Sequence, residues 1–212
     1  IVSLYLTHLS KNSKISTLRR RLVSISMVHR LKGHYLDTKH PIIVENLMGI
    51  KRVKGSIQKG KKPILINHLK SIINVIDEQK IESIKKFRDK SIILVGFGGG
   101  FRRTELTSID YEDLEFVPEG LKIIIKRSKT DQFGEGMIKG LPYFTNEKYC
   151  PVYNLKKWLE ISKIKSGSIF RRFLKGSSLT DKRLTDQSVV LLMKEYLNLA
   201  GIENKNFAGH SL

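Results

Sequence analysis

The chain has 212 residues, and its 39 lysine and arginine residues against 20 acidic residues give a formal net charge of +19. A hydrophobic content of 40% and a charged content of 28% are ordinary for a soluble globular protein. The single cysteine excludes an internal disulfide and fits a reducing cytoplasm, and no apolar run approaches membrane-spanning length. The charge favours nucleic acid as partner over an anionic membrane surface, and a merely basic, highly soluble protein is the plain alternative.

Most of the excess charge lies in the first part of the chain. Residues 1–62 contain 14 lysine and arginine residues, but their only acidic residues are Asp37 and Glu45. This segment is therefore predicted to be a dedicated polyanion-binding module. Its end, "KRVKGSIQKGKKP" at residues 51–63, has two glycines and few large apolar residues, which predicts a basic inter-domain linker.

A helix is predicted between Ser16, a suitable N-cap, and Gly33, a suitable stop signal. A second, shorter helix is expected through Val44 to Met48. In the first helix, apolar residues recur at three- and four-residue spacing and form one stripe that can face a core. This stripe consists of Leu18, Leu22, Ile25 and Val28.

Beyond residue 63, helices are expected over Ile66–Ile76 and Ile81–Arg88. The pair Cys150-Pro151 opens a further predicted helix, in which Trp158 is expected to be a core residue, and another helix runs from Thr185 to Leu199. Between these helices, three strand-like segments separated by turn residues predict a small antiparallel sheet. The predicted strands are Leu114–Val117, Leu121–Arg127 and Gly136–Pro142.

The stretch "GFGGGFRRTELTSID", residues 96–110, follows the apolar run Ser91–Val95 and has two interpretations. A dinucleotide-binding loop needs a strand, the pattern G-x-G-x-x-G and then a helix. Gly96 and Gly98 fit this pattern, but Phe101 takes the place of the third glycine. The helix would also begin with two arginines, where the helix dipole disfavours cations. The second interpretation is a turn that delivers an arginine to a different kind of phosphate.

Three motifs, in order, resemble those of the tyrosine recombinases, which are also called phage integrases. "GFRRTELTSIDYEDL" resembles the family pattern G-x-R-x-x-E-L, and "IIIKRSKTDQFGEG" resembles its lysine-bearing β-hairpin. Near the end, "FAGHSL" matches the first three letters of the family's H-x-L-R motif. The resemblance covers essentially the whole chain, and it implies that Arg102, Lys129 and His210 are catalytic residues.

The resemblance also implies a fold of two domains. Residues 1–50 are expected to form an all-α core-binding domain that grips a duplex, and residues 51–63 its basic linker. Residues 64–212 are expected to form an incomplete catalytic domain of mixed α+β type, with helices and a small antiparallel sheet. The expected DNA-binding residues, most of which lie away from the apolar stripe, are Arg19, Arg20, Arg21, Arg30, Lys51, Arg52 and Lys54.

The implied partners are double-stranded DNA and further copies of the protein, which form a tetrameric synapse in intact relatives. No cofactor, metal ion, membrane or small-molecule substrate is expected, and the expected location is the cytoplasm. The arginines are expected to supply the positive charge that a metal ion would otherwise bring to a phosphate.

The family reaction cleaves and rejoins DNA strands through a covalent 3′-phosphotyrosine. The paired N–H donors of Arg102 would match the non-bridging oxygens of the phosphate, whose charge grows in the transition state. Lys129 would protonate the leaving 5′-oxygen as general acid, and His210 would donate to the phosphate or handle the proton of the nucleophile. Glu105 is expected to brace local structure.

The sequence departs from the family pattern at Leu212, where the second catalytic arginine should follow and the nucleophilic tyrosine come later. Since no covalent intermediate forms without a nucleophile, the chain is expected to be an inactive fragment of a site-specific recombinase. Without closing helices, Val190, Met193 and Leu197 are expected to be under-covered. One alternative is a non-catalytic protein that occupies recombination sites. Another, a nucleotide-dependent oxidoreductase, would require the glycine loop to bind a dinucleotide.

Overall fold

The computed structural model describes residues 1–55, 60, 62–79, 84–126, 136–174, 178–203 and 207. Contacts divide the chain into two compact units, Ile1–Gly60 (unit 1) and Lys61–Leu212 (unit 2). Each unit has its own hydrophobic core. The division lies within the segment that the sequence predicts as a linker.

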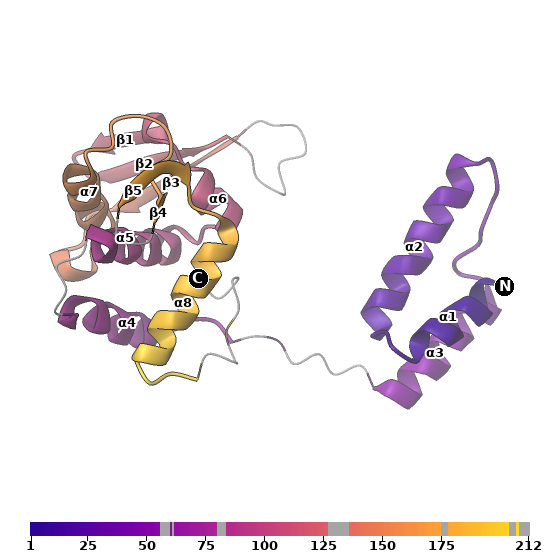
Figure 1. Ribbon diagram of the computed structural model, residues 1–212. Helices are drawn as coiled ribbons and strands as arrows, with labels where there is room; N and C mark the ends of the chain where they lie inside the picture. The colour runs from indigo at the N-terminus through magenta and orange to yellow at the C-terminus, as the bar shows by residue number, and fades with distance from the viewer. Residues whose placement is uncertain are drawn as a thin grey trace. The chain divides into compact units, whose positions relative to one another are not determined.

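Unit 1 is helical throughout its regular structure, with α1 (Val2–Ser10), α2 (Ile15–Leu31) and α3 (Pro41–Lys54) (Figure 1). α3 begins with a proline, whose missing N–H is not needed in the first turn. Gly33 follows α2 with a φ of 77°, a conformation that glycine adopts without strain. The buried core of unit 1 consists of Leu6, Ile15, Leu18, Leu22, Ile43 and Ile50.

Three details of unit 1 differ from the sequence analysis. α2 begins at Ile15, ahead of the expected N-cap Ser16, because Ile15 is itself a core residue. Val28 was placed in the buried stripe but is 52% exposed, since this small core covers only the first part of α2. α3 continues to Lys54, into the predicted linker, and basic residues are favourable in the last turn of a helix.

Unit 2 is built around one buried helix. α5 (Ile84–Gly99) contacts α4 (Ile66–Glu78), α6 (Arg103–Ser108), α7 (Pro151–Ser162) and α8 (Asp186–Leu199) (Figure 1). Residues 88–96 of α5 are all buried. A helix enclosed on every side is apolar on every side, so the run Ser91–Val95 shows no helical periodicity. This explains why the sequence analysis ended the helix at Arg88.

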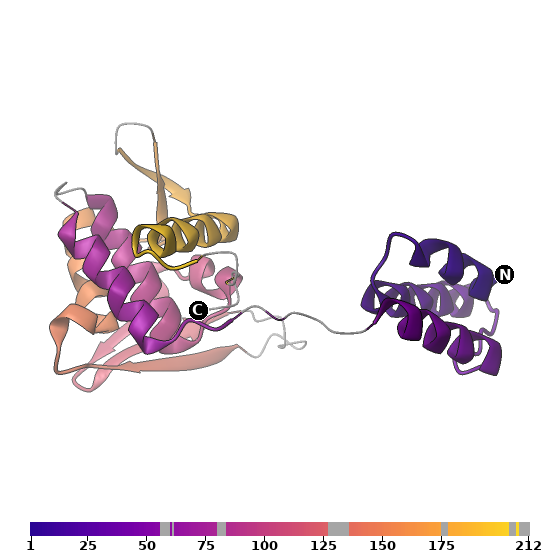
Figure 2. The ribbon, with the colours of Figure 1, turned by 90° about the horizontal axis from the view of Figure 1, so that it is seen from below.

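The predicted antiparallel sheet is confirmed. β1 (Leu114–Val117), β2 (Gly120–Ile125) and β3 (Met137–Pro142) pair in the order β1-β2-β3, with Ile123 opposite both Leu114 and Lys139. Figure 2 shows this sheet along one edge of unit 2, with α4, α5 and α8 on one side of it. Short 3-10 helices at Tyr111–Asp113 (η1) and Glu147–Tyr149 (η2) flank the sheet in the chain.

A second antiparallel hairpin, β4 (Arg171–Phe173) and β5 (Leu179–Arg183), was not predicted. Both strands are short, and the residues of β5 are half-buried or exposed. Such strands carry no alternating apolar pattern for a sequence analysis to detect.

The core of unit 2 contains the residues expected there. Trp158 is fully buried, and its Nε1–H donates to the carbonyl oxygen of Ile169 at 2.8 Å. Met193 and Leu197 of α8 are 5% and 1% exposed. The expectation that these two side chains are under-covered is therefore wrong, because α4, α5 and α6 pack against α8.

A buried polar group joins α5 to α8. Asp89 accepts hydrogen bonds from Arg88, at 2.6 Å from Nη2, and from the hydroxyl of Tyr196 at 3.0 Å. Burial raises the pKa of Asp89 although Arg88 opposes this effect, and burial likewise raises the pKa of Tyr196. Arg88 also donates to the carbonyl oxygen of Arg171 at 2.9 Å, so the group reaches β4.

None of the helices in the described ranges is long and apolar enough to cross a membrane.

Candidate functional site

The glycine-rich stretch joins two helices. α5 runs to Gly99, and Gly100 reverses the backbone with a φ of 54°. The N–H of Phe101 donates to the carbonyl oxygen of Gly96 at 3.1 Å, which closes the helix end as in a Schellman motif. α6 then begins directly after Arg102. A dinucleotide-binding loop requires a strand before its glycines, but a helix precedes them here. This excludes the nucleotide interpretation.

Arg102 is held at the start of α6 by a buried carboxylate. Its Nη1 donates to Oε1 of Glu105 at 2.8 Å, and its backbone N–H donates to Oε2 of Glu105 at 3.0 Å. The Glu105 side chain is 3% exposed, whereas that of Arg102 is 41% exposed. One acid thus fixes both the main chain and the side chain of an arginine that still reaches the surface. The backbone contact is the acidic half of a capping box.

Lys139 of β3 reaches the same turn from the sheet. Its Nζ donates to the carbonyl oxygens of Gly99 and Gly100, both at 3.0 Å, and lies 3.6 Å from Oε2 of Glu105. It also lies 4.4 Å from the centroid of the Phe101 ring, within the range of a cation–π contact. Lys139 therefore contacts the turn that precedes Arg102 and the acid that holds it.

Arg103 has a different environment from its neighbour. Its Nη1 lies 3.7 Å from Oδ2 of Asp186, in the first turn of α8. Its Nε is buried and has no hydrogen-bond partner among the described residues. Arg103 thus connects α6 to α8, whereas Arg102 pairs with an acid of its own helix.

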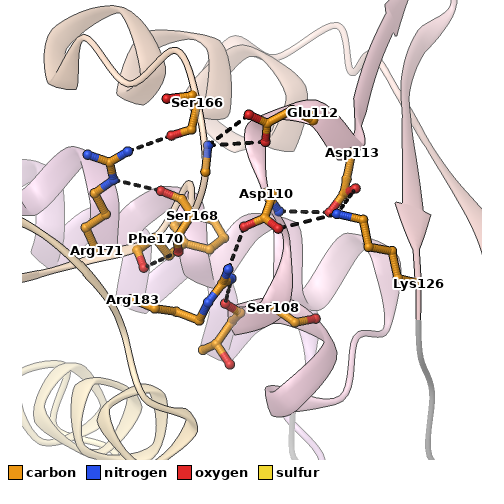
Figure 3. Close-up of polar contacts among 12 residues, drawn as sticks. Ser108, Asp110, Glu112, Asp113, Lys126, Ser166, Ser168, Phe170, Arg171 and Arg183 are labelled. Atoms are coloured by element: carbon orange, nitrogen blue, oxygen red, sulfur yellow. Dashed lines mark hydrogen bonds and ion pairs between the residues drawn. The ribbon is translucent and has the colours of Figure 1, made fainter.

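Asp110 lies where the ends of three elements meet (Figure 3). Its Oδ1 accepts a hydrogen bond from Nη2 of Arg183 at 2.5 Å, and its Oδ2 lies 3.4 Å from Nζ of Lys126. Arg183 also donates to the carbonyl oxygen of Thr107 at 2.7 Å, and Lys126 bonds Asp113 at 2.8 Å. One carboxylate therefore links the end of α6, the end of β2 and β5.

The cations around Asp110 decide its charge state. Burial acts to raise the pKa of Asp110, but the hydrogen bonds and charges of Arg183 and Lys126 outweigh burial and hold this pKa below its ordinary value. The hydrogen bond with Asp113 is the main cause that raises the pKa of Lys126. The group is therefore an ion-pair network at neutral pH.

A neighbouring set of contacts holds the loop that precedes β4 (Figure 3). Both carboxylate oxygens of Glu112 accept the N–H of Gly167, at 3.0 and 3.2 Å. Arg171 donates to the carbonyl oxygen of Ser166 at 2.6 Å and pairs with Asp181 of β5 at 2.5 Å. These contacts attach the β4–β5 hairpin to η1.

The seven cations predicted to bind DNA lie on two helices of unit 1, and all are exposed. Two of them are engaged within the unit. Arg21 donates to the hydroxyl of Tyr5 at 3.1 Å, and Nζ of Lys54 lies within 3.4 Å of the carbonyl oxygens of Lys11 and Ser13. The other five are Arg19, Arg20, Arg30, Lys51 and Arg52.

The four arginines of α2 do not share one face. Successive residues of an α-helix advance by about 100° around its axis. Arg19 and Arg30 therefore lie on the same flank of α2, and Arg20 points away from the core formed by Leu18 and Leu22. Arg21 lies on the opposite flank, where it meets Tyr5 of α1.

Of the three predicted catalytic residues, only Arg102 is placed. Lys129 and His210 lie outside the described residues. Within the described ranges, no group of three or more histidine, cysteine, aspartate and glutamate residues is arranged to hold a metal ion. Lys139 was not predicted from the sequence, and no local pattern marks it, because the pairing of β3 brings it to its partners.

The model of the phage integrase family matches residues 64–212, which is more than half of the chain. The chain belongs to the phage integrase family. The resemblance inferred from the ordered motifs is thereby confirmed. The chain is also 40% identical, over 211 residues, to an integrase/recombinase XerD homolog of Selenomonas ruminantium. That match covers 98% of this chain but 61% of the relative, so the chain spans less than two thirds of the relative's length.

Solved structures show that this family member shares the fold of DNA recombinases. XerH site-specific recombinase, bound to a palindromic difH substrate in a post-cleavage complex, matches 99% of this chain and 57% of its own, with a TM-score of 0.70 and 16% identity. A lambda integrase dimer bound to a COC′ core site matches 98% of this chain and 63% of its own, with a TM-score of 0.56 and 14% identity. At these identities the likeness establishes the fold alone.

Proposed function

We propose that this chain is the duplex-binding and phosphate-positioning part of a site-specific DNA recombinase. The observation that carries the proposal is the geometry of Arg102, whose partly exposed guanidinium is held by the buried Glu105 in a chain of the phage integrase family. A guanidinium offers paired donors that match two phosphate oxygens, and bracing it in advance reduces the entropy lost on binding.

Each of the two units has its own proposed role. Unit 1 acts as the core-binding domain, with exposed cations such as Arg19 and Arg30, which lie on one flank of α2, as its phosphate contacts. Unit 2 acts as the catalytic domain and presents Arg102 to the scissile phosphate. Both structural relatives described above are bound to DNA, which supports duplex DNA as the partner and self-association on DNA as the assembly.

The other catalytic roles rest on the family resemblance. We assign Lys129 as the general acid for the leaving 5′-oxygen and His210 as a donor to the phosphate. Strand cleavage also needs a second arginine and a tyrosine nucleophile, and residues 1–212 offer no match to either in the family order. Cleavage is therefore proposed only where these groups are supplied, and these residues alone bind DNA without cutting it.

Salt-dependent DNA binding tests the proposal. Affinity for a short DNA duplex, measured by fluorescence anisotropy, should fall steeply with salt, because phosphate contacts release counterions. Replacing both Arg19 and Arg30 by Ala should lower the slope of log affinity against log salt by about one per lost contact. Arg21→Ala is the control for the loss of one charge, to be compared per charge removed, since Arg21 lies on the other flank and is bonded to Tyr5. A salt-independent affinity, or equal effects of the variant and the control, contradicts the proposed surface.

A second experiment separates binding from cleavage. A nicked duplex traps covalent protein–DNA complexes, which denaturing gels detect. We expect the 212-residue chain to bind this substrate and to form no covalent complex. A covalent complex would show that one of the seven tyrosines present acts as nucleophile, and it would overturn the binding-only assignment.

A further inference from the structure

The side chain of Lys139 contacts both the turn before Arg102 and the acid that holds Arg102. We propose that Lys139 is a positioning residue for Arg102, which orients its main chain and keeps its guanidinium available to an anion. This inference rests on the proposed role of Arg102 as a phosphate ligand. Lys139 itself is not assigned any contact with DNA.

Lys139 stabilises the main chain of the turn before Arg102. The carbonyl oxygens at the C-terminal end of a helix lack intrahelical partners and carry the negative end of the helix dipole. Nζ of Lys139 donates hydrogen bonds to two such oxygens, those of Gly99 and Gly100, at 3.0 Å each. Gly100 has the left-handed φ that turns the chain toward Arg102. The contact with Lys139 therefore stabilises the turn that immediately precedes Arg102.

Lys139 also changes the electrostatic field around Arg102. Glu105 is nearly fully buried and lies 2.8 Å from the guanidinium of Arg102 and 3.6 Å from Nζ of Lys139. Among the described residues, Glu105 faces two cations, and Lys139 offsets part of the field that this buried carboxylate exerts on Arg102. Removing Lys139 would leave the buried carboxylate to draw more strongly on Arg102.

The paired strand holds Lys139 in place. Lys139 lies in the middle of β3, where its partner across the sheet is Ile123, a fully buried residue. Its Nζ also lies over the Phe101 ring, and the side chain is 20% exposed. A cation placed by a paired strand moves less than one placed by a loop, which suits a positioning role.

A double-mutant cycle tests this inference. Arg102→Ala and Lys139→Met are made singly and together in the full chain, and binding to a short DNA duplex is measured at low salt. We expect Arg102→Ala alone to weaken binding about tenfold, which corresponds to about 1.4 kcal/mol. In the Lys139→Met background, the same substitution should have an effect of less than about twofold, because the guanidinium is no longer presented.

The controls separate the inference from the function on which it rests. Lys122→Met is the matched control, since Lys122 lies on the adjacent strand β2 and pairs with the exposed Glu115 at 2.9 Å. It should leave the full effect of Arg102→Ala in place, and Lys139→Arg should restore most of that effect. Additive losses in the cycle would overturn the positioning role of Lys139. No effect of Arg102→Ala in any background would instead contradict the proposed phosphate contact.

A measurement on the free protein tests the positioning role independently of DNA binding. The Nε–H signal of Arg102 in nuclear magnetic resonance spectra reports how firmly its side chain is held. It should be retained in Lys139→Arg and Lys122→Met, and it should broaden or shift in Lys139→Gln, which keeps donors but loses the charge. If Lys139→Met does not fold, the cycle is completed with Lys139→Gln. An Arg102 signal unchanged in Lys139→Gln and Lys139→Met contradicts the inference.

Discussion

Oε1 of Glu105 lies 2.8 Å from Nη1 of Arg102, and Oε2 of the same carboxylate accepts the backbone N–H of Arg102 at 3.0 Å. The two residues are three positions apart, at the first turn of α6. Because one buried carboxylate holds both the backbone and the guanidinium of Arg102, a substitution of Glu105 should affect both the stability of unit 2 and the proposed phosphate site.

Glu105→Gln should destabilise unit 2 by about 1–3 kcal/mol, because it removes a buried charge that serves Arg102 and Lys139. Unfolding by urea can be followed through the fluorescence of Trp158, the only tryptophan, which is buried in unit 2. Glu115→Gln is the control, since Glu115 forms an exposed pair with Lys122 that should contribute about 0–1 kcal/mol. Equal losses in the two variants would contradict the bracing role of Glu105.

Asp110 should make the stability of unit 2 depend on pH. Its pKa is lowered in the folded protein, so the folded state binds this proton less readily than the unfolded chain. The stabilisation is present above the unfolded pKa of about 3.9 and is lost as the pH falls through the lowered folded pKa. Asp110→Asn should therefore reduce the loss of stability on acidification from about pH 6 to about pH 3, measured by urea unfolding.

Arg183→Met provides a cross-check on this network. It removes the cation that makes the strongest contact with Asp110, at 2.5 Å, so it should also flatten the pH dependence. The variant with both substitutions should show little additional change, because contacting residues are coupled. Full additivity of the two effects would show that Asp110 and Arg183 act separately.

Tyr196→Phe should destabilise unit 2 by about 1–3 kcal/mol, because it removes the hydrogen bond that the Tyr196 hydroxyl donates to the buried carboxylate of Asp89. Tyr111→Phe is a suitable control, since Tyr111 is 37% exposed and its substitution should change stability by less than about 0.5 kcal/mol. Both variants can be compared by chemical denaturation with Trp158 as reporter. Equal stabilities would show that the Tyr196 hydroxyl contributes little to the contact between α5 and α8.

The glycines before Arg102 should differ in their tolerance of alanine. A Cβ on Gly99 would lie 2.2 Å from the ring of Phe101, whereas on Gly98 its nearest neighbour would be Pro151 at 3.4 Å. Gly98→Ala should therefore be neutral or stabilise α5 by about 0.5–1 kcal/mol, and Gly99→Ala should destabilise unit 2 by about 1–3 kcal/mol. Thermal unfolding of the two variants measures the difference. Equal tolerance would show that the Phe101 ring can move aside.

The family and the concentration of positive charge in the first 62 residues could be predicted from the sequence, and so could a turn that places Arg102 for a phosphate. Motif spacing is set over a few positions of the chain, and the charge excess is a property of composition. Both can therefore be read from the sequence alone. The antiparallel sheet was also predictable, because turn residues separate its three strands.

The surroundings of Arg102 depend on contacts between distant parts of the chain. Lys139 meets Gly99 through strand pairing, although 40 positions separate them, and Arg183 meets Asp110 across 73 positions. Burial on every side also hid the periodicity of α5, and the short polar strands β4 and β5 carried no pattern. In each case, packing between distant segments selects the contacts, whereas a local sequence pattern reflects only the contacts within its own turn or strand.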